Sequence, residues 1–166
     1  MSDHSELMLN FYNEEKIFSF ILIIIGTLSL LFSLFFFLII KYNLFKGMAI
    51  ILFLFAILYV LAGIKFTSIN NHKIHQFSES KQTNDLSFII SEQKKTTTSV
   101  RILHYSRWFE LSVLLISLGM YIKQKNSYWK GVFLALCCMF FISLIFNEYS
   151  IKSKESYLAL ISSLID

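Results

Sequence analysis

Four stretches of the chain carry no more than one charged side chain, and a long polar segment separates the second from the third. The first stretch runs from Ile17 to Ile40 and has no charge over 24 residues. A helix of that length is about 36 Å long, and about 20 apolar residues span the hydrocarbon core of a bilayer. A soluble helix keeps one polar face toward water, and this stretch has none. The pattern predicts a membrane-spanning helix over 17–40.

The other apolar stretches predict three further spans, over 47–64, 108–122 and 131–147. Glu110 falls inside the third and is best tolerated near the edge of the membrane. The predicted fold is all-α: an integral membrane four-helix bundle that forms a single domain over 1–166. Hydrophobic residues make up 55% of the chain, and four spans leave no room for a separate catalytic unit.

A small polar loop is predicted between spans two and three, over 65–107. Its apolar centre at 88–90 suits a short strand or an interfacial helix, and 99–108 suits a helical extension of the third span. The tail over 150–166 predicts an amphipathic helix, which lies on the membrane surface or docks on a neighbouring subunit. Its apolar positions are Tyr157, Leu158, Ile161, Leu164 and Ile165.

Small residues recur every seven positions in the predicted spans. In membranes such residues let helix backbones approach closely, and a seven-residue period is typical of left-handed helix packing. The pattern predicts helix contacts, within the chain or in a homo-oligomer, while chance spacing of common small residues is the alternative. The predicted packing residues are Ser19, Gly26, Ser33, Ala49, Ala56, Gly63, Ser112, Gly119, Gly131, Ala135 and Cys138. Phe32, Phe35 and Phe36 should face lipid or a neighbouring subunit.

Charge patterning gives two readings of the orientation. The short turns at 41–46 and 123–130 hold five lysines and no acid, whereas the other side of the membrane holds ten Lys and Arg spread over longer segments. Positive charge counts most in short segments next to a span. Lysine density therefore favours the turns inside the cell and both termini outside. Under that orientation the turn lysines are candidate partner-docking residues: Lys41, Lys46, Lys123, Lys125 and Lys130.

Candidate chemistry is sparse. His72 and His75 are spaced for a shared metal on a helix, but solvated loop histidines are the stronger interpretation. Arg107 and Glu110 are one helical turn apart and should form an ion pair. Cys137 and Cys138 are adjacent within span four and should serve as small packing residues. We predict no catalytic residue, no metal, no cofactor and no nucleic-acid binding.

The scarcity of ionisable residues in the spans bears on function. Proton-coupled transporters carry such residues at membrane depth, and here none lies deeper than Glu110. This argues against a transporter and against an enzyme acting within the membrane. Two classes remain: a non-enzymatic scaffold or sensor subunit that acts through a partner protein, and an oligomeric pore that depolarises the membrane.

The layout of four uncharged spans, one polar connection and Lys-rich turns resembles small membrane proteins of bacterial conflict systems. These include immunity proteins against pore-forming toxins and the four-span membrane subunit of the Kiwa antiphage system. The likeness covers the whole chain in outline and includes no specific motif. It implies a bacterial inner-membrane protein in antiviral defence or toxin immunity, working with a separate cytosolic effector.

Overall fold

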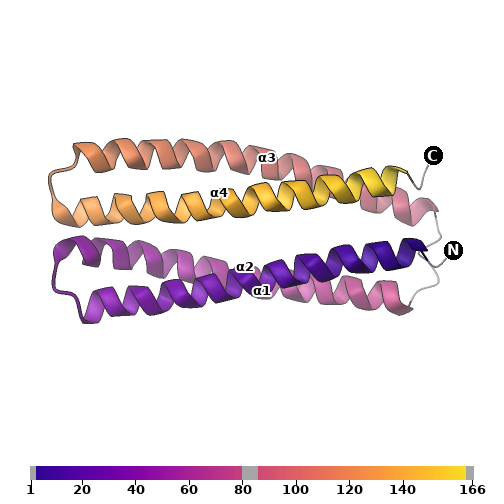
Figure 1. The fold of residues 1–166 in the computed structure, drawn as a ribbon, viewed down its shortest axis with the longest axis horizontal. Coiled ribbons are helices and arrows are strands. Elements are labelled where there is room, and N and C mark those ends of the chain that lie inside the picture. Colours follow the sequence, from indigo (N-terminus) through magenta and orange to yellow (C-terminus); the bar gives the residue numbers. More distant parts are fainter. Residues whose placement is uncertain (1–2, 80–85, 164–166) are drawn as a thin grey trace.

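The computed structural model describes residues 3–79 and 86–163, which form four long α-helices. These are α1 (Asp3–Leu38), α2 (Asn43–Glu79), α3 (Leu86–Lys123) and α4 (Ser127–Ser162). The helices run lengthwise beside one another (Figure 1). The short turns after α1 and α3 lie at one end of the bundle. Both termini, the last turn of α2 and the first turn of α3 lie at the opposite end. The chain is therefore all-α, as the hydrophobic pattern predicts.

Local signals set the ends of the helices at the turns. Asn126 caps α4: its backbone is extended and its side-chain oxygen accepts a hydrogen bond from the amide of Tyr128 at 2.9 Å. The side chain of Gln124 accepts from the amides of Lys125 and Asn126, which satisfies two further donors in the same turn. Because the chain has no proline, nothing interrupts the helices between their ends.

The four helices form two hairpins, α1 with α2 and α3 with α4, and the hairpins join mainly through α2 and α4. Two glycines set the closest approach. A Cβ at Gly131 would lie 1.8 Å from the carbonyl oxygen of Leu44, and one at Gly47 would lie 2.1 Å from that of Tyr128. Neither position has room for a side chain, so the backbones of α2 and α4 touch at the end that carries the turns.

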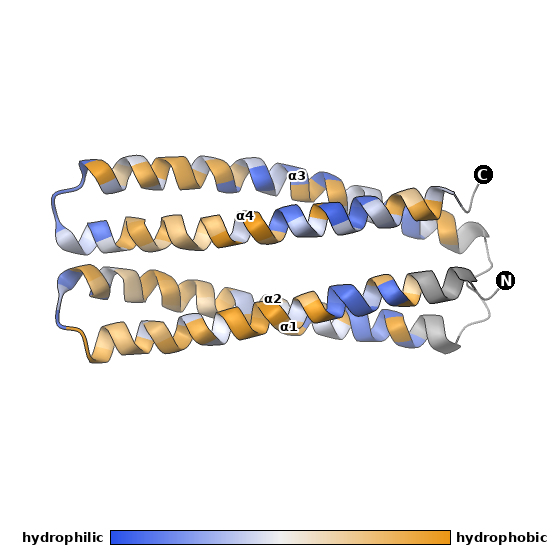
Figure 2. Cartoon of the chain, viewed as in Figure 1, coloured by the Kyte–Doolittle hydropathy of each residue, from blue (hydrophilic) through white to orange (hydrophobic). Residues whose placement is uncertain are grey.

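Hydropathy divides the bundle along its length. The half with the turns is dominated by apolar residues, and the half with the termini mixes polar and apolar residues (Figure 2). Three helical segments are long and apolar enough to cross a membrane: Met8–Leu38, Asn43–His75 and Ser127–Ser162. They indicate a multi-pass membrane protein. α3 does not reach this level, since Arg107 and Glu110 lie within its most apolar part.

The predicted loop over 65–107 is wrong for most of its length, because α2 continues to Glu79 and α3 begins at Leu86. The predicted tail is helical as far as Ser162, as expected, but it continues α4 without a break and is not a separate element. The physical reason is a small hydrophobic core in the polar half of the bundle, called the second core here because it lies apart from the helix contacts in the apolar half. It consists of Met8, Tyr12, Ile89, Tyr157 and Ile161.

This second core accounts for the apolar positions of the tail. Tyr157 and Ile161 are buried against α1 and α3 of the same chain. They are therefore turned neither toward a membrane surface nor toward a neighbouring subunit. Leu164 and Ile165 lie outside the described residues. Ile89, from the apolar centre of the predicted loop, belongs to helix α3 and to the same core.

The first two series of small residues face each other between α1 and α2. A Cβ at Gly26 would lie 3.0 Å from the carbonyl oxygen of Ala56, and one at Gly63 would lie 2.8 Å from that of Ser19. In the third pair of small residues, the hydroxyl of Ser33 donates a hydrogen bond to the carbonyl oxygen of Ala49 at 2.7 Å. The α1–α2 contact is thus built from small residues seven positions apart.

In the other two series of small residues, those of α3 and α4, some positions are buried and others are exposed. Gly131 and Ala135 are buried, but Cys138 is exposed and Met139 takes the buried position beside it. Ser112 and Gly119 are also exposed, and no atom lies within 4 Å of the Cβ position at Gly119. Within the chain, α3 packs through Ser117, which is 3% exposed, and not through Ser112 or Gly119. The predicted packing roles of Cys138, Ser112 and Gly119 therefore fail inside one chain.

We expect the double substitution Gly26→Leu with Ala56→Leu to open the α1–α2 hairpin, because two bulky side chains would meet at one crossing. Membrane packing contacts are worth about 1 kcal/mol each, so the double change should lower the melting temperature in detergent clearly more than either single change. Phe32→Leu is the matched control, because Phe32 is 55% exposed and should tolerate the change. Equal melting temperatures for the double variant and the control would contradict the packing.

Candidate functional site: a polar cavity between the two hairpins

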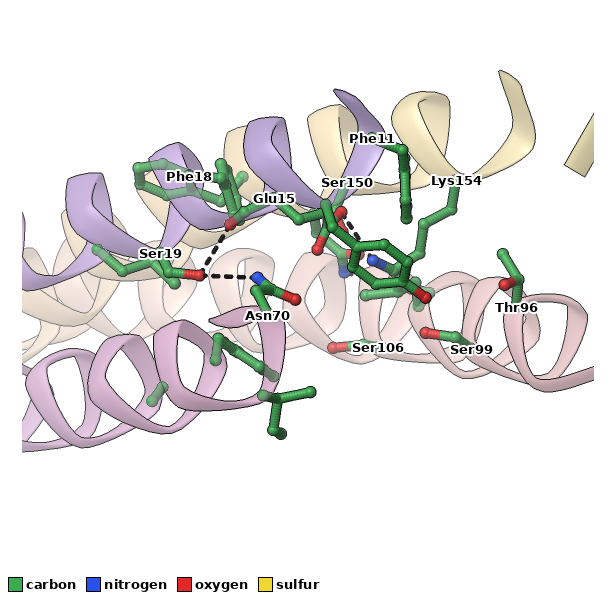
Figure 3. Close-up of a pocket in the computed structure, with 18 of the residues that line it drawn as sticks. Phe11, Glu15, Phe18, Ser19, Asn70, Thr96, Ser99, Ser106, Ser150 and Lys154 are labelled. Carbon is green, nitrogen blue, oxygen red and sulfur yellow. Dashed lines mark hydrogen bonds and ion pairs between the residues drawn. The ribbon is translucent and has the colours of Figure 1, made fainter. Parts of the chain in front are cut away.

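A cavity of about 490 Å³ lies between the hairpins and is lined by all four helices. It extends from the level of Tyr59 and Glu110 to the level of Lys73 and Glu92, so it crosses from the apolar half of the bundle into the polar half. Figure 3 shows serines, a threonine, an asparagine and charged side chains around it. The hairpins leave this space because the backbones of α2 and α4 touch near the turns. In the polar half the two hairpins are joined by long lysine and glutamate side chains, which hold the backbones farther apart.

The deep end of the cavity holds Glu110, which is 8% exposed. Its carboxylate accepts hydrogen bonds from the hydroxyls of Ser106 at 3.2 Å and Ser143 at 2.9 Å. The side-chain amide of Asn147 donates to it at 3.2 Å. All three donors are neutral. Within the described chain no cationic side chain forms an ion pair with this carboxylate.

Glu110 lies well inside the apolar half. It is 13 residues from the end of α3 at Lys123, which is about 20 Å along the axis. The uncharged part of α1 extends from Leu38 to Lys16, about 33 Å from the same end. Ionisable residues at such depth face the bundle interior or a water-filled cavity and mark functional positions.

The outer end of the cavity is held by ion pairs between helices. Lys73 on α2 contacts Glu92 on α3 at 2.9 Å, and the hydroxyl of Tyr12 on α1 donates to the same carboxylate. Lys154 on α4 contacts Glu15 on α1 at 2.8 Å. Each of these lysines has a carboxylate of its own. The pairs join the hairpins across the gap and leave the interior of the cavity open.

An aromatic contact separates the cavity from an apolar groove between α1 and α4. The rings of Phe18 and Phe146 lie 5.2 Å apart and line both spaces. The groove has a volume of about 400 Å³ and includes Ile17, Ile21 and Ile145. Phe18 and Phe146 therefore form the wall between the groove and the cavity.

The predicted ion pair between Arg107 and Glu110 is wrong. Arg107 contacts Glu148 on α4 at 3.0 Å, on the outside of the bundle, and Glu110 faces inward. A shift of three positions turns a helix by about 300°, so the two side chains need not meet when each has a better partner on α4. The structure places the carboxylate of Glu110 in the interior of the bundle, a position that the sequence pattern did not predict.

The remaining candidate residues lie outside the cavity. Four of the turn lysines are exposed and Lys130 is half-buried, all at the end that carries the turns. His72 and His75 lie on the exposed side of α2, and His104 contacts Glu155 at 3.3 Å. Over residues 3–79 and 86–163, no group of three or more His, Cys, Asp or Glu is placed to hold a metal ion. The thiol of Cys137 lies 3.9 Å from the carbonyl oxygen of Leu114.

Comparisons with protein-family models, curated proteins and solved structures find no match to this chain.

Proposed function

We propose that the chain is a non-enzymatic sensor subunit of a bacterial inner membrane, which crosses the membrane four times and acts through a partner protein. The observation that carries this proposal is the continuity of the helices. Each helix runs without a break from the apolar half into the polar half. A tilt or rotation at one end is therefore transmitted to the other, which is what a sensor of membrane state requires.

The fourth crossing is made by α3, although it is the most polar helix. Its inward-facing Glu110 is hydrogen-bonded on the inside of the bundle, and its Arg107 is paired with Glu148. Polar side chains that are satisfied by neighbouring helices cost far less in a bilayer than the same side chains exposed to lipid. Packing against α4 therefore supports α3 in the membrane.

We assign partner docking to the end of the bundle that carries the turns, and detection of the trigger to the polar half. Lysine density favours the turns in the cytosol, where five lysines lie at one end of the bundle. A partner with an acidic surface, such as a cytosolic effector, would dock there. The polar half then faces outward and detects the trigger. The resemblance of the layout to conflict-system membrane proteins supports a role for such a sensor in antiphage defence or toxin immunity.

We expect a variant with all five turn lysines changed to glutamine to lose its stoichiometric partner. The measurement is affinity purification of the tagged chain from native membranes, followed by quantification of the copurified protein. Lys94→Gln with Lys152→Gln is the control, because both lysines are exposed on the polar half. Retention of the partner by the turn variant, with loss in the control, would move the docking surface to the polar half.

One observation favours the alternative, an oligomeric pore. Ser112 and Gly119 form an exposed pair of small residues on α3, where a second copy could pack. Purified chain in liposomes would conduct ions under that alternative and would not under the sensor proposal. Sustained ion currents from the wild-type chain without any partner would overturn the sensor role.

A further inference from the structure

The deep end of the cavity is short of positive charge. Glu110 is buried, with 8% of its surface exposed, and within the described chain its carboxylate accepts hydrogen bonds from the neutral side chains of Ser106, Ser143 and Asn147. A buried carboxylate without a cation is costly, and such groups are paired or bind a cation. Because no cationic side chain of residues 3–79 and 86–163 pairs with it, a cationic ligand can supply the positive charge.

Asn147 gives a second and independent observation. Its side chain is 6% exposed, and its amide nitrogen donates both to Glu110 and to the carbonyl oxygen of Leu103 at 3.2 Å. Its side-chain oxygen is buried and has no hydrogen-bond donor in the described chain. Buried acceptors are normally satisfied. The side chain of Asn147, which donates to Glu110, therefore has one unmet hydrogen bond next to the cavity.

The lysines that line the cavity do not meet this need. Lys73 and Lys154 are each held at the outer end by Glu92 and Glu15, at 2.9 and 2.8 Å. Lys95 is exposed. Around the deep end the walls are largely apolar, with Leu22, Tyr59, Ala62 and Leu103 among them. The ligand should thus combine a positively charged N–H donor with an apolar body.

We propose that the cavity binds a small organic ammonium ion. Its ammonium group donates to the carboxylate of Glu110, and its apolar body lies against Tyr59 and Leu103. Entry is from the groove between α1 and α4, past Phe18 and Phe146. The inference goes beyond the sensor role and stands whether or not a partner protein is found. The ammonium group can belong to a free amine or to an amine-bearing lipid headgroup.

The test measures binding of phenethylammonium to the purified full-length chain in phosphatidylglycerol nanodiscs by calorimetry, with the heat of binding to empty nanodiscs of the same lipid subtracted for each probe. The neutral probe 2-phenylethanol has nearly the same shape and is measured beside it. We expect the amine to bind at least tenfold more tightly than the alcohol, because a hydrogen bond to a buried charge is worth about ten- to a hundredfold in affinity. Equal affinity for both probes would show that the cavity does not recognise the ammonium group, and would overturn the proposal.

Variants locate the site. Glu110→Gln should weaken amine binding at least tenfold, and Asn147→Ala should weaken it several-fold. Glu148→Gln is the matched control, because it removes one negative charge from the next residue of α4 without touching the cavity, and it should leave binding unchanged. Ala62→Phe should block binding by filling the cavity while Glu110 stays intact. This variant decides the question if Glu110→Gln fails to fold. Amine binding that survives both Glu110→Gln and Ala62→Phe would contradict the site.

The lipid composition of the nanodisc separates the two sources. Phosphatidylethanolamine carries an ammonium group and phosphatidylglycerol does not. If the occupant is a lipid headgroup, nanodiscs that contain phosphatidylethanolamine should weaken phenethylammonium binding by competition, relative to nanodiscs in which phosphatidylcholine replaces it at the same content of phosphatidylglycerol, and Glu110→Gln should abolish the competition. If the occupant is a free amine, the affinity should be the same in both discs. Either result supports the site and assigns its ligand.

Discussion

Gly131→Ala is expected to separate the two hairpins and to cause the largest loss of stability of any single methyl group added to this chain. The new Cβ would lie 1.8 Å from the carbonyl oxygen of Leu44, which is backbone and has no rotamer that relieves the clash. Overpacking a tight contact typically costs about 1–3 kcal/mol, and a backbone clash at a helix crossing should reach the upper end. The measurement is unfolding in a denaturing detergent.

Gly119→Ala is the control for the chemistry of the change. It adds the same methyl group to a glycine within a helix, where no atom lies within 4 Å. Alanine is favoured over glycine in a helix by about 1 kcal/mol, so this variant should be as stable as wild type or more stable. Gly47→Ala should behave like Gly131→Ala, since its Cβ would lie 2.1 Å from the carbonyl oxygen of Tyr128. Unchanged unfolding of both crossing variants would contradict the α2–α4 contact.

Glu92→Ala is the second change with a large expected effect. The side chain of Glu92 is 4% exposed and holds Lys73 at 2.9 Å and the hydroxyl of Tyr12, so three helices depend on it. Removing one partner of a buried ion pair costs about 3–5 kcal/mol, because the other charge is left without compensation. Since Lys73 is 20% exposed and can reach water, we expect the lower end of that range. Hydrogen exchange should show the loss mainly in the polar half.

The double variant Glu92→Leu with Lys73→Met tests the cause. If the uncompensated lysine is the main cost, the double variant should recover much of the stability that Glu92→Ala loses. Glu155→Ala is the comparison for an exposed pair, since the side chains of His104 and Glu155 are 45% and 52% exposed. It should change stability by less than about 1 kcal/mol. A Glu92→Ala protein that is as stable as the Glu155→Ala protein would show that the network does not hold the polar half together.

The apolar half of the fold could be predicted because lipid imposes a simple rule. An uncharged stretch long enough to span the bilayer must be helical. The small residues of 17–40 and 47–64 recur with one period, and the structure sets Ser19, Gly26 and Ser33 opposite Gly63, Ala56 and Ala49. The α3 series has the same spacing, yet Ser112 and Gly119 face outward. Spacing alone does not tell which face of a helix meets a neighbour.

The polar half was harder to predict because its core is thin. Among the described residues, α1 contributes Met8 and Tyr12, α3 contributes Ile89 and α4 contributes Tyr157 and Ile161, while α2 adds the partly buried Ile74. Such a narrow stripe in a polar segment is weak evidence for a helix until its partners are known. The partners come from both ends of the sequence, so the core exists only once α1 and α4 are brought side by side.

The cavity was missed for a related reason. Arg107 and Glu110 form a familiar ion-pair spacing, and the sequence offers no sign that α4 supplies a separate partner to each of them. Glu148 forms an ion pair with Arg107, and Ser143 and Asn147 donate hydrogen bonds to the carboxylate of Glu110. One signal was present: Ser143 and Asn147 are four residues apart in an otherwise apolar span, which places two polar side chains on one face of the helix.

The most direct test of the account is the membrane topology of α3. Single cysteines are introduced by Asn13→Cys, Tyr42→Cys, Ser127→Cys and Ser163→Cys in a background with Cys137→Ser and Cys138→Ser. All four positions are exposed, and each is labelled with a membrane-impermeant maleimide from either side of sealed vesicles.

With four crossings, the cysteines at positions 42 and 127 react from one side, and those at positions 13 and 163 react from the other. If α3 stays out of the membrane, only three crossings remain. Position 127 then reacts together with position 13, and position 163 together with position 42. That result would contradict the four-crossing bundle, and with it the sensor proposal built on that bundle.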